Sequence, residues 1–193
     1  MIYDDFIGIE EKAISEDSCK EIISFFETHT NLQVEGVVSD SNTGGVRVDR
    51  KIKSSTDICR SFSQEGHPEK HILDAIFLSM PKYQEKYNSL NQIGQWTLCD
   101  NYNIRRYKPG QGYFREHCEM HGRGSSSDRL MAWMLYLNDV TDGGETYFRL
   151  QDKAVKAETG KFLVWPAYWT HPHNGIVSNT QIKYIATGWF VYV

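Results

Sequence analysis

The sequence has little of what a secreted, membrane-spanning or nucleic-acid-binding protein needs. Its four cysteines are widely spaced and form no CxxC pair, which argues against a disulfide framework or a zinc knuckle, so we expect reduced, mostly buried thiols. No apolar run approaches the ~20 residues needed to cross a bilayer, and residues 1–15 lack the features of a signal peptide. A formal net charge of −4 disfavours a phosphate backbone as partner. These absences predict a cytoplasmic protein.

What is present fits one globular domain over residues 1–193. Apolar residues make up 40% of the chain and charged residues 24%, a balance typical of a folded domain of this length. The aromatic content is high, with Tyr 11, Phe 9 and Trp 5, and these side chains suit strands and pocket walls.

The first half of the chain, residues 1–95, reads as mainly helical support. A short apolar opening strand is predicted over residues 2–9, and Ser15 is placed to cap an amphipathic helix over 16–29. A second helix is predicted to begin near Pro68, and Pro81 should end that helix or start another.

From residue 96 the apolar periodicity changes to two, and turn residues divide the chain into short runs. Gly143-Gly144 should form a tight turn between two of these runs. Helices followed by many short strands predict a mainly β (α+β) fold, either a β-sandwich or a jelly roll (double-stranded β-helix) over 96–193, with packed N-terminal helices. The expected strands are 97–107, 112–119, 130–138, 145–150, 161–165, 173–178 and 182–192.

Two histidines and a glutamate in the β-rich half could meet at a metal ion. In a strand, alternate residues share a face, so His117 and Glu119 should point the same way. His173 lies near the start of another expected strand, and it would complete a two-histidine, one-carboxylate set of the kind that binds Fe(II) in non-haem oxygenases. An HxE tripeptide is common by chance, and His171 competes with His173, so spacing alone leaves this open.

A lysine in the last expected strand is also informative. Along residues 182–192, the side chains of Lys183, Ile185, Thr187 and Trp189 share one face. Lys183 and Thr187 could hold an anionic group, because a buried lysine needs a partner or loses its charge.

Four motifs follow one another in the second half of the chain: Tyr107–Glu119 (YKPGQGYFREHCE), Leu135–Thr146 (LYLNDVTDGGET), Trp165–His173 (WPAYWTHPH) and Lys183–Trp189 (KYIATGW). In these motifs and their order, the chain resembles the prolyl 4-hydroxylase-like family of 2-oxoglutarate/Fe(II) oxygenases. The resemblance spans roughly residues 96–192. Small oxygenases of this type occur in bacteria and their phages, so the predicted location is the cytoplasm of a bacterium or of a phage-infected host.

The resemblance implies a role for each matching residue. His117, Glu119 and His173 would be the iron ligands, and Lys183 would pair with the distal carboxylate of 2-oxoglutarate. Thr187, Tyr107 and Tyr136 would lie around the co-substrate. Arg129 would lie on the substrate side, and Trp189 would lie beside the iron. The implied cofactors are Fe(II) and 2-oxoglutarate, with ascorbate as a further possibility.

Two departures from the family pattern concern the metal site. The family usually has Asp where this chain has Glu119, which is one methylene longer. One extra residue also separates Tyr113 from His117, and a β-bulge could absorb it. We hypothesise that the two changes compensate each other.

The implied activity is a 2-oxoglutarate- and O₂-dependent hydroxylation, giving succinate and CO₂, of a prolyl residue in a peptide or protein. The alternatives are an oxygenase acting on a free amino acid or nucleobase, a Zn²⁺- or Mn²⁺-dependent hydrolase or isomerase on the same fold class, and a non-catalytic binding module. A hydrolase has no need of the Lys183–Thr187 pair. Residues 39–45 and 121–129 are loops by composition and candidate lids over the substrate.

Overall fold

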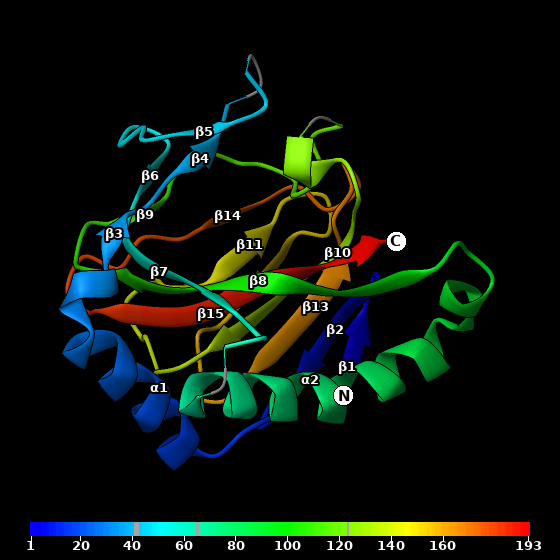
Figure 1. Ribbon diagram of the computed structural model, residues 1–193, viewed down its shortest axis with the longest axis horizontal. Helices are drawn as coiled ribbons and strands as arrows, with labels where there is room; N and C mark the ends of the chain where they lie inside the picture. Colours follow the sequence, from blue (N-terminus) through cyan, green and yellow to red (C-terminus); the bar gives the residue numbers. More distant parts are fainter. Residues whose placement is uncertain (41–42, 65, 123) are drawn as a thin grey trace.

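The computed structural model describes residues 1–40, 43–64, 66–122 and 124–193, and it is built mainly of β-strands with two α-helices (Figure 1). The large sheet has the strand order β1-β2-β13-β10-β15-β8-β7-β3, and its pairings are antiparallel. A smaller sheet has the order β12-β11-β14. The elements are β1 (Ile2–Asp4), β2 (Ile7–Glu10), α1 (Glu16–Thr28), β3 (Val34–Glu35), β4 (Val38–Ser39), β5 (Val46–Arg47), β6 (Lys53–Ser54), β7 (Thr56–Ser61), α2 (His67–Lys86), β8 (Trp96–Tyr107), β9 (Gly112–Tyr113), β10 (Arg129–Tyr136), β11 (Thr146–Phe148), β12 (Lys153–Val155), β13 (Phe162–Pro166), β14 (His173–Gly175) and β15 (Lys183–Tyr192).

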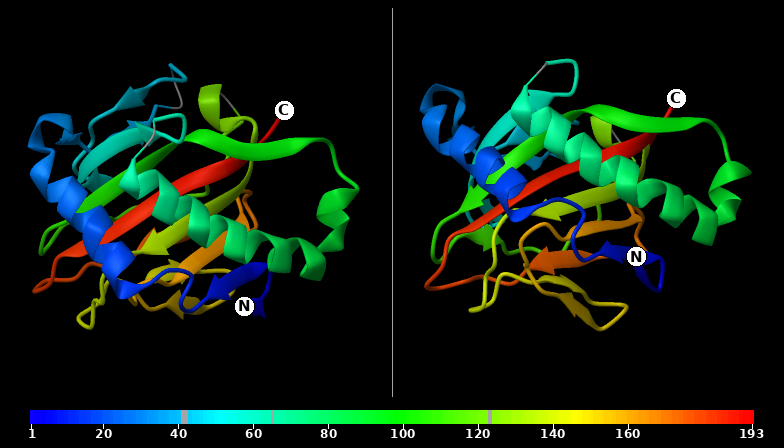
Figure 2. Two further views of the ribbon diagram at one scale, coloured as in Figure 1. Left: turned by 60° about the horizontal axis from the view of Figure 1, so that its bottom comes forward. Right: turned by 90° about the horizontal axis from the view of Figure 1, so that it is seen from below.

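The two helices lie on one face of the large sheet (Figure 2). Ser15 caps α1 as predicted, because its hydroxyl accepts a hydrogen bond from the Ser18 amide at 3.1 Å. The apolar stripe of α1 and the inner side of α2 pack with β10 and β13 into one buried cluster, which includes Phe26, Ile72 and Trp133. The prediction of a jelly roll with packed helices is confirmed.

A second buried cluster fills the space between the two sheets. The alternation along β10 divides its side chains, so that Trp133 faces the helices while Met134 and Tyr136 face the smaller sheet. The same alternation turns one face of β15 toward the space between the sheets. Polar side chains placed on that face are therefore inside the protein.

The first half contains more β-structure than its composition predicts. The opening strand is a hairpin, β1 and β2, because Asp5 and Phe6 both have positive φ and reverse the chain. Strand β7 joins the large sheet beside β8, although Asp57 and Arg60 hide its alternation. Short strand β12 was also not predicted.

Pro81 neither ends nor starts a helix but lies inside α2. Pro81 has no amide hydrogen, so the carbonyl of Phe77 lacks its helical hydrogen-bond partner. The residue Phe77 is 67% exposed, so this side of the helix is open to water. Gly143 and Gly144 both have positive φ, as the predicted tight turn requires. The expectation of mostly buried thiols is wrong, because of the four free cysteines only Cys19 is buried.

The expected strand 112–119 is short and interrupted. Only Gly112 and Tyr113 form a strand, β9, which pairs with β6. The amides of Phe114 and Arg115 then both point to the Ile52 carbonyl, at 2.8 and 3.4 Å. Two successive amides facing one carbonyl are the pattern of a β-bulge, located where the extra residue was noted.

The loops predicted over 39–45 and 121–129 lie partly outside the described residues. Their described flanks include β4 and β5, which pair as a hairpin on the opposite side of the molecule from the helices (Figure 1). Within the described part of the chain, no helix is long and apolar enough to span a membrane.

Candidate active site

The structure brings His117, Glu119 and His173 together although 56 residues separate the two histidines in the sequence. The Nε2 atoms of His117 and His173 lie 3.6 and 3.3 Å from Oε1 of Glu119. A reciprocal backbone bridge joins the two histidines, because each amide donates to the other's carbonyl at 2.9 Å. The main chain therefore fixes the distance between the two imidazoles.

Backbone contacts orient each imidazole toward this common point. Nδ1 of His117 lies 3.1 Å from the Arg115 carbonyl, and Nδ1 of His173 lies 3.0 Å from the His171 carbonyl. A carbonyl only accepts hydrogen bonds, so Nδ1 carries the proton in both rings and Nε2 keeps its lone pair. Two such nitrogens beside a carboxylate oxygen form a metal-binding donor set with its outer contacts already made.

The second oxygen of Glu119 is held from the opposite side. The Trp189 indole N–H donates to Oε2 at 2.8 Å, and Arg129 Nη1 lies 3.4 Å from Oε2 and donates to the Glu119 carbonyl at 3.0 Å. The guanidinium of Arg129 also stacks over the Trp189 ring at 3.7 Å. These contacts leave Oε1 for a metal ion and restrict the rotation of the longer glutamate side chain.

The electrostatics keep Glu119 ionised and favour the neutral form of His117. Burial alone would raise the pKa of Glu119, but its contacts with His117 and His173 outweigh burial and hold the pKa well below the usual value. Burial and the nearby His173 lower the pKa of His117. Both directions favour the protonation states that metal ligands need.

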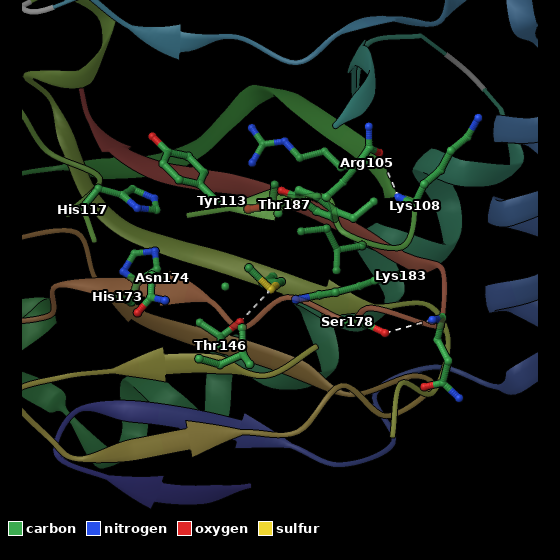
Figure 3. Close-up of a pocket in the computed structure, with 18 of the residues that line it drawn as sticks. Arg105, Lys108, Tyr113, His117, Thr146, His173, Asn174, Ser178, Lys183 and Thr187 are labelled. Carbon is green, nitrogen blue, oxygen red and sulfur yellow. Dashed lines mark hydrogen bonds between the residues drawn. The ribbon is translucent and has the colours of Figure 1, made fainter. Parts of the chain in front are cut away.

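Lys183 lies across the same cavity from the histidines, and its amine points into it (Figure 3). The side chain is 7% exposed, and among the described residues no carboxylate lies within ion-pair distance of Nζ. Burial lowers its pKa to about 8, although the charge of Glu145 acts in the opposite direction. A buried ammonium without a counter-charge is suited to receive an anion from solution.

The other residues predicted around the co-substrate occupy different positions. Thr187 and Tyr107 line the cavity, and the Thr187 hydroxyl donates to the Trp133 carbonyl at 2.9 Å. Tyr136 lies behind the wall, where its hydroxyl meets Thr146 Oγ1 at 2.6 Å, while its ring is 5.2 Å from Lys183 Nζ. Thr146, and not Tyr136, lines the cavity at this point.

Arg105 and Tyr113 are among the wall residues that were not singled out from the sequence. Arg105 is two residues before Tyr107 on β8, so strand alternation alone puts it on the same inward face. The ring of Tyr113 stacks on that of His117 with centroids 3.7 Å apart. Tyr113 and His117 also line a second, neighbouring cavity, whose wall includes Arg129 and the β4–β5 hairpin. His117 therefore lies where the two cavities meet.

A second cluster of possible metal ligands lies on the helices. Glu21 of α1 and His67 and His71 of α2 also bring one ligand atom each within 4.8 Å of one another. Glu21 and His67 are exposed, and this cluster is separate from the cavity. It provides a useful control for experiments on the buried triad.

Two histidines and one carboxylate, held here between jelly-roll sheets, are the donor set that non-haem Fe(II) oxygenases use. Comparison with known proteins supports this class. Residues 102–191 match the family model described as the 2OG-Fe(II) oxygenase superfamily, where 2OG is 2-oxoglutarate. Its members use Fe(II) and 2-oxoglutarate.

The individual relatives are prolyl hydroxylases. Prolyl 4-hydroxylase 5 of Arabidopsis thaliana is 27% identical over 154 residues, which cover 77% of this chain and 44% of the relative. The viral collagen prolyl hydroxylase of Paramecium Bursaria Chlorella virus-1, solved as a 2OG complex, is 20% identical with a TM-score of 0.65 and coverage of 98% and 97%. A Pseudomonas putida prolyl-4-hydroxylase is 17% identical with a TM-score of 0.67 and coverage of 97% and 93%.

A structure from Trichoplax adhaerens, a prolyl hydroxylase in complex with a hypoxia inducible factor oxygen degradation domain peptide fragment, extends the fold comparison. It has a TM-score of 0.72 at 15% identity and covers 97% of this chain and 84% of its own. The predicted resemblance to prolyl 4-hydroxylase-like oxygenases is confirmed, and the comparisons favour an oxygenase over a hydrolase. The chain spans less than half of the length of its plant relative.

Proposed function

We propose that this protein is an Fe(II)- and 2-oxoglutarate-dependent dioxygenase that hydroxylates a prolyl residue in a peptide or protein. Its prolyl hydroxylase relatives and the neighbouring cavity at the triad support a peptide substrate. The single observation that carries the proposal is the pairing, in one cavity, of a pre-oriented His–Glu–His set with an uncompensated buried lysine. Ascorbate dependence and a cytoplasmic location stay predictions.

The donor set fits Fe(II). Two neutral imidazole nitrogens and one carboxylate oxygen are the ligands that non-haem Fe(II) sites use, and they leave coordination positions open for small molecules. His117, Glu119 and His173 would hold the ion, with Trp189 and Arg129 positioning Glu119. When bound, Fe(II) together with 2-oxoglutarate supplies O₂ activation and C–H oxidation, giving succinate and CO₂ as co-products.

The other residues bind and orient the co-substrate. Lys183 would attract the distal carboxylate of 2-oxoglutarate, and Thr187 and Thr146 add polar surface to the same cavity. Ile185 and Met134 add apolar surface that excludes water. Tyr107 lies beside Lys183, with its ring 5.9 Å from Nζ.

Oxygen-dependent conversion of 2-oxoglutarate to succinate in the presence of prolyl peptides tests the proposal. The expected product is a peptide heavier by one oxygen atom, and the assay compares the wild type with His173→Ala. His71→Ala is the matched control, because it removes a histidine from the exposed cluster and leaves the cavity intact. Equal turnover by wild type and His173→Ala would refute the role of His173. A hydroxylated product on a residue other than proline would refute the substrate class.

A further inference from the structure

Three charged side chains cluster at one corner of the cavity, where Arg105 lines the wall while Lys53 and Asp57 are buried and do not line it. Asp57 Oδ2 lies 2.6 Å from Lys53 Nζ, and its Oδ1 accepts a hydrogen bond from Ser55 at 2.7 Å. Asp57 and Arg105 are direct partners across β7 and β8, and Arg105 Nε lies 3.3 Å from Oδ2. A single carboxylate therefore faces two cations.

Arg105 is incompletely paired. Lys53 and Ser55 already occupy both oxygens of Asp57, and within the described chain the buried Nε of Arg105 has no hydrogen-bond partner. Its guanidinium points along the cavity toward Tyr113 (Figure 3). Arg105 thus offers N–H donors at the end of the cavity where Tyr113 stacks on His117.

The proposed ligands leave the charge of this corner unchanged. Fe(II) and 2-oxoglutarate carry equal and opposite charges and Arg129 balances Glu119, so these groups leave no net negative charge for Arg105. Lys183 would attract a carboxylate of 2-oxoglutarate at its own position in the cavity and adds a further positive charge. The surplus positive charge shared by Lys53, Asp57 and Arg105 would then remain, and a buried charge without a partner is costly.

We infer, resting on the proposed function, that Arg105 together with Tyr113 binds a carboxylate of the primary substrate close to the residue that is hydroxylated. A planar guanidinium receives a carboxylate through two parallel N–H···O bonds, and a tyrosine hydroxyl can donate a third. The carboxylate can come from the chain end of a C-terminal proline or from an aspartate or glutamate side chain beside an internal proline.

Peptide binding can be measured without turnover. Anaerobic calorimetric titration of the Fe(II)- and 2-oxoglutarate-loaded wild type would compare three prolyl peptides that share a core sequence. One has an amidated C-terminal proline, one has a free C-terminal carboxylate, and one has an aspartate beside an internal proline. A carboxylate-bearing peptide should bind about 10- to 100-fold more tightly than the amidated one, the range for a charged hydrogen-bonded pair. Which peptide gains identifies the source of the carboxylate.

Arg105→Gln should remove this preference while leaving the amidated peptide nearly unchanged. Arg106→Gln is the matched control, because Arg106 is the next residue on β8 but pairs with Glu27 at 2.7 Å on the opposite face. Arg105→Lys keeps the positive charge and should retain part of the preference, even if the glutamine variant folds poorly.

Two results would overturn the inference. One is equal binding of all three peptides by the wild type, and the other is that Arg105→Gln weakens binding of all three by the same factor. A loss confined to 2-oxoglutarate affinity, read from peptide-independent succinate formation, would assign Arg105 to the co-substrate instead. Absence of succinate formation with every peptide refutes the proposed function, whereas a carboxylate preference in the titration still supports the binding role of Arg105.

Discussion

Replacing Lys183 by methionine tests the co-substrate end of the cavity. The two side chains are similar in length, so the change removes the ammonium group with little loss of apolar packing. Lys183 is buried between Tyr107 and Tyr136, with Nζ 5.9 and 5.2 Å from their ring centroids. No described carboxylate lies near enough to pair with it, so its removal should not leave an unpaired acid in the protein. The variant should fold.

The expected loss falls on 2-oxoglutarate. Removing one partner of a buried ion pair costs about 3–5 kcal/mol. At about 1.4 kcal/mol for each factor of ten, this corresponds to a roughly 100- to 4000-fold weaker affinity for the co-substrate. Fe(II) affinity should stay near the wild-type value, because the triad lies across the cavity from Lys183.

Equilibrium binding under anaerobic conditions measures both affinities separately. Lys183→Arg keeps the charge and should lose far less than Lys183→Met, and Lys153→Met, at an exposed ion pair with Asp4, is the surface control. Wild-type 2-oxoglutarate affinity in Lys183→Met would refute the assignment of this residue. An equal loss of Fe(II) affinity would show that the substitution disturbs the whole cavity.

Three further predictions concern pH, the Glu119 contacts and packing. Burial lowers the pKa of Lys183 to about 8, so the amine is charged below this pH. The affinity for 2-oxoglutarate should therefore fall about tenfold per pH unit above pH 8, and a flat profile would contradict this. Trp189→Phe removes the 2.8 Å hydrogen bond to Glu119 Oε2 and should weaken Fe(II) binding about 10- to 100-fold in a metal titration; unchanged binding would dismiss this contact. Gly188→Ala would place a methyl group 2.6 Å from the Trp133 ring and should lower the free energy of unfolding by about 1–3 kcal/mol in urea; wild-type stability would refute the tight packing.

The sequence predicts the parts of the fold that follow a strong period. The amphipathic helix after Ser15 and the long strands β8, β10 and β15 have regular alternation and clear end signals, so they are found nearly at their observed bounds. Strand β7 is missed because its inward residues include Asp57, which is buried by virtue of its ion pairs. Polar residues that satisfy one another inside a protein are invisible to a hydrophobic pattern.

The candidate site also contains residues that the sequence predicts and residues that only the structure shows. His117, Glu119 and His173 were identified from short spacings and a family resemblance, and the structure places them together. Their pairing depends on a backbone bridge between distant segments, which no local pattern encodes. Arg105 was missed because its significance lies in a charge surplus shared with Lys53 and Asp57, which only the three-dimensional arrangement shows.

The reciprocal backbone bridge between His117 and His173 has a consequence for how the proposed metal site is loaded. Because peptide groups, and not the ion, tie the two segments together, stripping the metal with a chelator should leave the barrel assembled and able to reload. Iron could then be lost and regained many times during the lifetime of one molecule. The supply of the ion, more than refolding, would then limit how fast a metal-free molecule regains activity.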